Sequence, residues 1–454
     1  MDTTRNDAPA AAGVSLRRVL TLWDLILYGI VLIMPIAPVP LFGVVQKLSN
    51  GHAVTTILLG MVAMGLTAFS YGRMAALYPA AGSAYTFVAR GLHAHLGFLA
   101  GWAMFLDYLL VPLICTIYGA LTMKRIVPAV PYGVWVVVFA LTMTVVNLRG
   151  IKATARVNLA LMLAMCGVVL AFFVLAVRYL LHAQGWHGLF SSEPFYSPAT
   201  FNLHSIGTAT ALAALTYGGF DGVTTLAEEV HNPRRNVLLA TVFVCLFTGV
   251  FGGLQVYLAQ RVRPDYHTFP QLETAFMDVA RDVGGAGLFQ AMAAILILAN
   301  VGCGLAAQAG VSRLLYGMGR DGALPRWFRY LNPARGTPDF NICIAGALAL
   351  GGAFFLDYER CGELINFGAF LAFMGVNAAV IRQFFVLRQP GHQRNFWGDA
   401  LAPALGFLFC LAIWLSLATP AKILGGIWFA AGVAYDAWLT RGFRQAPVMP
   451  GFGE

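Results

Sequence analysis

Long apolar segments alternate with short polar ones along almost the whole of this chain. An α-helix needs about 20 apolar residues to cross a bilayer, and twelve segments come near that length or exceed it. We expect membrane-spanning helices at approximately 22–46, 53–78, 95–123, 132–148, 155–182, 203–230, 236–260, 285–318, 340–357, 362–387, 398–418 and 420–440. The pattern therefore predicts an all-α membrane protein with twelve transmembrane helices.

Two of these segments contain residues that interrupt helices. The first carries Pro35, Pro38 and Pro40, and each proline removes a backbone donor and pushes the preceding residue out of the α region. The sixth carries Gly218 and Gly219, which let a helix unwind and free its backbone groups. Breaks five helices apart are what a five-plus-five inverted repeat with discontinuous helices 1 and 6 predicts. Ordinary proline kinks and glycine packing are the alternative explanation.

The repeat gives the chain its expected organisation, without a soluble domain or a linker. We expect a cytoplasmic tail at 1–19, a first repeat at 20–182 with helices 1 to 5, a second repeat at 203–387 with helices 6 to 10, helices 11 and 12 at 398–440, and a cytoplasmic tail at 441–454. The outer loop at 260–284 is expected to contain a short surface helix near 272–283.

The composition supports this class and excludes others. Hydrophobic residues make up 59% of the chain and charged residues 11%, against about 25% charged in soluble domains. The net charge of +9 comes from basic residues that recur between apolar segments, so we interpret them as topology determinants and not as a nucleic-acid site. Their distribution predicts a multi-pass membrane protein with both termini in the cytoplasm. Because no CxxC, HExxH, GxSxG or Walker A sequence is present, we expect no enzyme activity, metal site or cofactor.

Acidic residues in the sixth apolar segment give the strongest functional signal. An acid at the centre of a membrane helix costs about 2.5–3.5 kcal/mol on insertion scales, yet Asp221, Glu228 and Glu229 lie in this segment. In an unwound helix the Asp221 carboxylate would pair with an ammonium group through charge-assisted hydrogen bonds. The alternative is that Asp221 caps the second half-helix.

Glu228 follows Asp221 at a spacing that places both acids on one helical face, about 10 Å apart. Such a pair suits an elongated diamine with an amine at each end. The alternative partner of Glu228 is Arg234 or Arg235 at the end of the segment. Glu229 faces elsewhere and is a candidate for a structural or gating role.

Other residues complete the predicted site. Tyr108 offers a hydroxyl group and an aromatic face to a cation, and its neighbour Asp107 is an intramembrane acid. Phe220 and Tyr217 are expected to close over the substrate, with plain packing as the alternative. The predicted substrate-binding residues are Asp221, Glu228, Tyr108, Gly218, Gly219, Phe220, Pro35 and Ile36, and the gating or proton-coupling candidates are Asp107, Glu229, Tyr217 and Glu363.

Short motifs, in their order along the chain, resemble those of the amino acid–polyamine–organocation superfamily. They include YPAAGSAY at 78–85, GFD at 219–221, SRLLY at 312–316 and RDG at 320–322. Within the superfamily the chain is most similar to putrescine importers, through LDYL at 106–109, DGVTTLAEE at 221–229 and INFGA at 365–369. The resemblance implies twelve helices, a leucine-transporter-like core of ten helices in inverted repeat, and uptake driven by protons or by the membrane potential.

Two departures from the superfamily pattern bear on substrate and coupling. Helix 1 carries Met-Pro-Ile-Ala-Pro at 34–38 in place of a glycine-rich cradle for a carboxylate. Helix 5 carries no lysine at 158–177 of the kind that serves as proton carrier in some relatives. The coupling ion therefore stays open.

Together, the residues and the resemblance predict a secondary active transporter that imports a small organic cation, putrescine or a related polyamine, by alternating access. An amino acid:proton symporter or exchanger is the alternative, with the α-carboxylate held by free N–H groups at the starts of the half-helices. The expected partners are a small amine or amino acid and the lipid bilayer, and the oligomeric state stays open. The expected driving force is the membrane potential, with protons as a further candidate.

Overall fold

The computed structural model describes residues 18–78, 83–150, 155–320, 324–387 and 393–447. In these ranges the regular structure is helical, apart from one isolated parallel bridge between Leu20 and Val230. The α-helices are α1 (Leu22–Ile33), α2 (Phe42–Leu48), α3 (Ala53–Leu77), α4 (Ser83–Gly91), α5 (Ala94–Ile126), α6 (Tyr132–Leu148), α7 (Ala155–Gln184), α8 (Leu203–Ala213), α9 (Pro233–Val262), α10 (Ala275–Arg320), α11 (Asp339–Gly352), α12 (Tyr358–Val380), α13 (Ala402–Leu415) and α14 (Thr419–Leu439). Shorter 3₁₀ or π segments are η1 (Gly185–Gly188), η2 (Ala214–Tyr217), η3 (Phe220–Glu229), η4 (Tyr266–Thr268), η5 (Arg326–Arg329), η6 (Ile381–Val386) and η7 (Trp397–Leu401).

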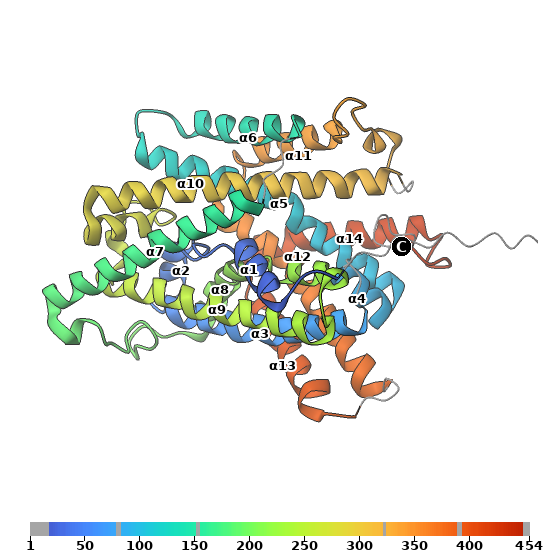
Figure 1. Cartoon of the computed structure of the whole chain (residues 1–454), viewed down its shortest axis with the longest axis horizontal. Helices are drawn as coiled ribbons and strands as arrows, with labels where there is room; N and C mark the ends of the chain where they lie inside the picture. The colour runs from blue at the N-terminus through green and yellow to red at the C-terminus, as the bar shows by residue number, and fades with distance from the viewer. Residues whose placement is uncertain (1–17, 79–82, 151–154, 321–323, 388–392, 448–454) are drawn as a thin grey trace, which may run out of the picture.

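The long helices run side by side along the long axis of the molecule (Figure 1). Seven helices of the described ranges are long and apolar enough to cross a membrane, namely Ala53–Leu77, Ala94–Ile126, Val157–Gly188, Pro233–Val262, Ala275–Arg320, Tyr358–Val386 and Trp397–Leu415. Helices α1, α6 and α11 are apolar but shorter. The all-helical class is thus confirmed, while the twelve crossings, the inverted repeat and the domain boundaries stay predictions.

The first predicted interruption lies between α1 and α2. Helix α1 begins at a capping box, in which the Thr21 hydroxyl accepts from the Asp24 N–H and the Asp24 carboxylate accepts from the Thr21 N–H at 2.8 Å. The helix ends at Ile33, and Met34 has a positive φ of 65°. Helical structure resumes only at Phe42, so the proline-rich stretch separates two half-helices.

The second predicted interruption separates α8 and η2 from η3. Gly218 is extended, with ψ of 130°, and Gly219 has a φ of 103° that favours glycine. A Cβ atom on Gly219 would lie 3.3 Å from the carbonyl oxygen of Leu32, which is close to the end of α1. The two broken helices therefore meet at their breaks, as the sequence pattern predicts for helices 1 and 6.

The observed helices differ from the predicted pattern of spans at two places. Helix α10 contains Gly285 with φ of 65° and ψ of −158°, so a kink separates its first turns from the long helix. These first turns lie where a short surface helix is expected near 272–283, but residues 275–280 are buried, so the helix packs into the protein instead of lying on its surface. The nine-residue helix α4 was not predicted, because a segment of this length is too short to stand out as a membrane span.

At one end of the molecule, the segment between α9 and the kink of α10 packs over α2. The ring of Phe42 packs edge-on against Phe269 at 6.0 Å and Phe276 at 5.6 Å between ring centroids. Gln46 Nε2 donates to the carbonyl oxygen of Pro264 at 2.8 Å. The segment between α9 and the kink of α10 thus covers the second half of the first broken helix.

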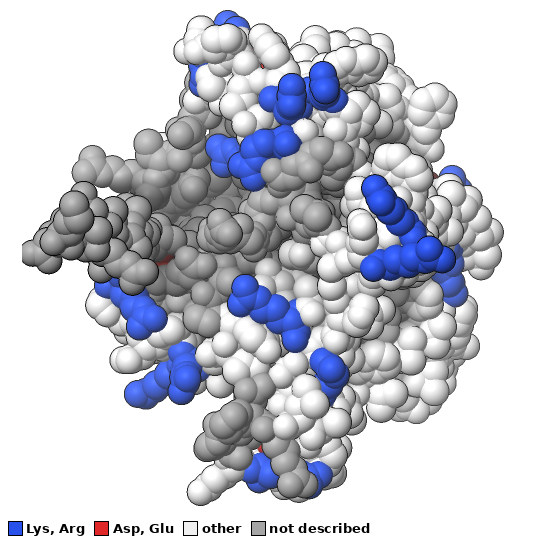
Figure 2. Space-filling view, turned by 90° about the vertical axis from the view of Figure 1, so that its right-hand side faces the viewer, with Lys and Arg blue, Asp and Glu red and all other residues white. Residues whose placement is uncertain are grey.

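The chain before α1 is hydrogen-bonded to the end of η3, which is the second half of the other broken helix. The N–H groups of Val19 and Leu20 donate to the carbonyl oxygen of Glu229 at 2.8 and 3.0 Å, and the His231 N–H donates to the Leu20 carbonyl at 2.9 Å. Figure 2 shows the end of the molecule at which the described chain terminates, and lysine and arginine far outnumber acidic side chains on it.

Candidate functional site

The site is built around Asp221, the second residue of η3. Its position follows from the glycine break, because the left-handed turn at Gly219 starts η3 beside the end of α1. Asp221 is buried, with 6% of its surface exposed. Gly219, and not Asp221, occupies the N-cap position of η3. A carboxylate is thus held in the interior at the point where two helices are interrupted.

Asp107 and Tyr108 of α5 come within electrostatic range of Asp221. These three residues were predicted from two distant parts of the sequence, and the fold brings them together. Tyr108 is 40% exposed although it lies in the middle of α5. Its ring therefore borders accessible space beside the buried acid.

Two further tyrosines belong to this cluster, and neither was among the predicted site residues. Tyr28 of α1 lies within electrostatic range of Asp221, is 37% exposed, and shares a side-chain hydrogen bond with Thr225 of η3. Tyr71 of α3 also lies near Asp221, and its buried hydroxyl has no hydrogen-bond partner within the described residues. Its hydroxyl therefore keeps a free hydrogen-bonding group close to the Asp221 carboxylate.

The cluster carries two carboxylates within electrostatic range of each other. Asp107 has no hydrogen-bond or ion-pair partner in the described part of the chain, and Asp221 is the charged group that acts on it. Keeping two acids together at membrane depth is costly unless a positive charge or a proton joins them. The arrangement between α1, η3 and α5 therefore suits a cationic ligand.

The predicted aromatic residues of the break are packed inside the protein. The Phe220 ring contacts Tyr71 at 5.3 Å and Phe373 at 5.2 Å between centroids. The Tyr217 hydroxyl donates to the Ile57 carbonyl oxygen of α3 at 2.6 Å. Both side chains are fully buried, so neither lines accessible space in this structure.

The predicted helix 1 residues are also buried. The Pro35 carbonyl, freed by the break, accepts from Gln255 Nε2 of α9 at 2.8 Å. Ile36 is 2% exposed and belongs to the apolar core. The free backbone groups of this break are thus partly satisfied by α9.

The remaining predicted residues lie apart from the cluster or outside the described atoms. Glu363 of α12 accepts from the Ala418 N–H at 3.2 Å, which ties it to the turn between α13 and α14. Glu229 ends η3, where its carbonyl binds the chain before α1. The backbone of Glu228 belongs to η3, but its side chain is outside the part that the structure describes. The predicted pairing of Glu228 with Asp221 therefore stays a prediction.

Comparison with known proteins gives a consistent result. Residues 22–423 match the amino acid permease family. The chain is 33% identical to the low-affinity putrescine importer PlaP of Escherichia coli K12, over 97% of this chain and 98% of the importer. It is 26% identical to the branched-chain amino acid permease BcaP of Lactococcus lactis, over 93% and 95%, and 26% identical to the methylthioribose transporter of Bacillus subtilis, over 92% of each chain.

Among solved structures, a single-residue mutant of the Eremococcus coleocola manganese transporter is similar in fold. The TM-score is 0.52 at 10% sequence identity, and the alignment covers 96% of this chain and 99% of that one. At this identity the similarity concerns the fold alone. The chain therefore shares the helical arrangement of a membrane transporter over nearly its whole length.

Proposed function

Since the chain belongs to the amino acid permease family, we propose that this multi-pass membrane permease is a secondary active transporter that imports a small organic cation. The substrate is putrescine or a related diamine. The observation that carries the proposal is the pair of acids, Asp107 and Asp221, beside the breaks of two helices. The family and its relatives are transporters and not enzymes, so transport is the activity to be explained.

The proposed binding mode follows from the chemistry of the cluster. Asp221 holds one ammonium group by charge-assisted hydrogen bonds. The exposed rings of Tyr28 and Tyr108 offer their negative faces to the same cation. Asp107 receives the second ammonium group of a diamine, and Glu228 is the other candidate for that role.

The transport cycle is proposed to follow from the predicted architecture. Twelve crossings with repeats at 20–182 and 203–387 would let the two halves rock around the midplane site, with both termini in the cytoplasm. A dication that enters a negative interior gains about 4.6 kcal/mol per 100 mV, twice the single-charge value. The membrane potential therefore favours import without a cofactor, and a proton carried by Asp107 or Asp221 is the candidate coupling ion.

The relatives include amino acid permeases, so an amino acid:proton symporter or exchanger is the second candidate. Free N–H groups at the break before η3 would hold an α-carboxylate. Asp107 and Asp221 disfavour a carboxylate at the same place, because like charges repel in a low-dielectric site. Competition of labelled putrescine uptake by diamines and by neutral or basic amino acids separates the two candidates.

Asp107→Asn is expected to weaken putrescine binding about tenfold, because a hydrogen bond to a charged group contributes roughly 1.5–3 kcal/mol. Binding of a monoamine of similar length, such as butylamine, should change less than twofold. The measurement is the apparent affinity of both amines as competitors of labelled putrescine uptake in proteoliposomes. Glu228→Gln is the companion variant. If this variant, and not Asp107→Asn, loses affinity for putrescine but not for the monoamine, then Glu228 binds the second amine. Equal losses for both amines would overturn the role of Asp107.

A further inference from the structure

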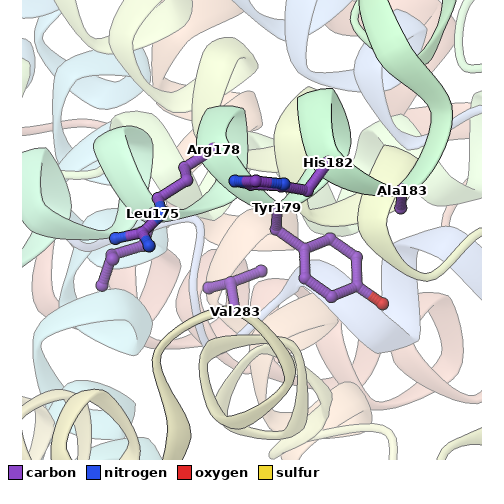
Figure 3. Close-up of a pocket in the computed structure, with 6 residues that line it drawn as sticks. All are labelled: Leu175, Arg178, Tyr179, His182, Ala183 and Val283. Atoms are coloured by element: carbon purple, nitrogen blue, oxygen red, sulfur yellow. The ribbon is translucent and has the colours of Figure 1, made fainter.

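A cavity that is open to the surface lies away from the broken helices. It has a volume of about 440 Å³ and is at the end of α7 that lies opposite the chain's C-terminus (Figure 1). Its lining residues are Leu175, Arg178, Tyr179, His182, Ala183 and Val283. Figure 3 shows Arg178 and Tyr179 reaching from α7 toward the turn that carries Val283. Nothing in the proposed transport site uses this cavity.

The cavity contains positive charge without a protein partner. Within the described residues, neither the Arg178 guanidinium nor the His182 imidazole forms a hydrogen bond or an ion pair. The acid beside Val283 is Asp282, and it faces Arg263 at 3.6 Å. An unpaired guanidinium with a nearby imidazole is suited to bind an anion, and its planar fork matches phosphate oxygens.

An exposed apolar stripe leads along α7 to these two residues. Leu163, Leu170 and Val174 are 59%, 54% and 68% exposed. Their spacing places them on one face of the helix, and Arg178 and His182 continue that face at successive intervals of four residues. Only 28% of the most apolar stretch of this helix is buried inside the protein. In a membrane protein such a face contacts lipid chains.

Aromatic residues place this end of α7 at the depth of lipid headgroups. Trp186 and Phe190 are 72% and 77% exposed just beyond the helix, and tryptophan and tyrosine are enriched at membrane interfaces. The short segment η1 that follows α7 is held to α9, because Arg261 Nε donates to the Gly188 carbonyl at 3.0 Å. The cavity therefore combines unpaired cations with an adjoining lipid-facing stripe.

We propose that this cavity binds the headgroup phosphate of an anionic phospholipid. Arg178 donates to the phosphate oxygens, His182 provides a second polar contact, and an acyl chain follows the Leu163–Val174 face of α7. Free inorganic phosphate shares the first contact but cannot use the stripe. A different explanation is that Arg178 and His182 only complement the negative end of the α7 dipole, and it predicts no preference among lipids.

The test uses the full-length protein in detergent and follows its thermal unfolding during titration with short-chain phosphatidylglycerol, phosphatidylcholine or inorganic phosphate. We expect phosphatidylglycerol to stabilise the wild type selectively and Arg178→Gln to weaken its apparent affinity about fivefold. Arg178→Lys, which keeps the charge but loses the planar fork, should bind phosphatidylglycerol with an affinity between those of the wild type and Arg178→Gln. Arg326→Gln, which removes an exposed arginine in η5, is the matched control and should titrate like the wild type.

Three results would overturn the proposal. The first is an Arg178→Gln variant that responds to phosphatidylglycerol like the wild type. The second is equal stabilisation of the wild type by phosphatidylcholine or by inorganic phosphate. The third is a loss of stability in Arg178→Gln that is the same with and without lipid, which would assign Arg178 to the helix dipole.

Discussion

Replacing Asp221 with asparagine is expected to lower putrescine uptake about a hundredfold. Asparagine keeps the size of the side chain but removes the negative charge that pairs with the ammonium group. Truncating one partner of a buried, hydrogen-bonded charge pair costs about 2–5 kcal/mol, and every 1.4 kcal/mol is about tenfold in affinity. The measurement is the initial rate of labelled putrescine uptake in proteoliposomes at concentrations below saturation.

The matched control for this variant is Asp265→Asn. Asp265 is exposed in the segment between α9 and α10, where its carboxylate accepts from the His267 N–H at 2.9 Å. This variant loses the same charge outside the proposed site and should transport within twofold of the wild type. Uptake by Asp221→Asn at the wild-type level would remove Asp221 from substrate binding, and an equal loss in both variants would point to a general effect of surface charge.

Gly219→Ala is expected to reduce uptake more than tenfold, because this residue forms the break itself. A φ of 103° is strained for any residue with a Cβ atom, at a cost of roughly 1–3 kcal/mol. The new Cβ would also lie 3.3 Å from the Leu32 carbonyl oxygen. Relief of both effects shifts η3 and moves Asp221 away from Asp107 and Tyr108. Uptake and thermal unfolding are measured together, so that loss of transport is separated from loss of folded protein.

Gly426→Ala serves as the control for the glycine break. Gly426 lies within α14, and no atom is found within 4 Å of a Cβ added there. Alanine in a helix interior is favoured over glycine by about 1 kcal/mol, so this variant should be at least as stable as the wild type and fully active. Wild-type transport by Gly219→Ala would show that the left-handed turn is not needed for the site.

The breaks in the fold could be predicted because they depend on local chemistry. Pro35 and Pro38 cannot continue a helix, and Gly218 with Gly219 permits the turn that starts η3. The 3₁₀ geometry of η3 could not be predicted in this way, because its apolar and polar positions also fit an α-helix.

The sequence predicts members of the candidate site where a residue type is by itself unusual in a membrane. Asp107 and Asp221 stand out as acids in apolar segments, and the structure brings them within electrostatic range. Tyr28 does not stand out, because its role depends on which face of α1 meets η3. Tyr217 was expected at the substrate, yet its hydroxyl binds the Ile57 carbonyl of α3, a partner 160 residues away in sequence. Such long-range packing is set by the whole helix arrangement.

Glu363 illustrates the same limit. An acid in an apolar segment is a functional candidate by default, and this one was predicted as a gate or proton-coupling residue. In the structure its carboxylate accepts from the Ala418 N–H, in the turn that joins α13 to α14. The sequence shows that such an acid needs a partner, but it does not show that the partner is a backbone group 55 residues away.

A structure of the protein in lipid nanodiscs with putrescine bound tests the central claim most directly. The account predicts ligand density between α1, η3 and α5, with one nitrogen within about 3 Å of an Asp221 carboxylate oxygen. It also predicts that the breaks at Met34 and Gly219 persist in the bound state. Putrescine density away from both breaks, with Asp221 bound only to protein groups, would contradict the account.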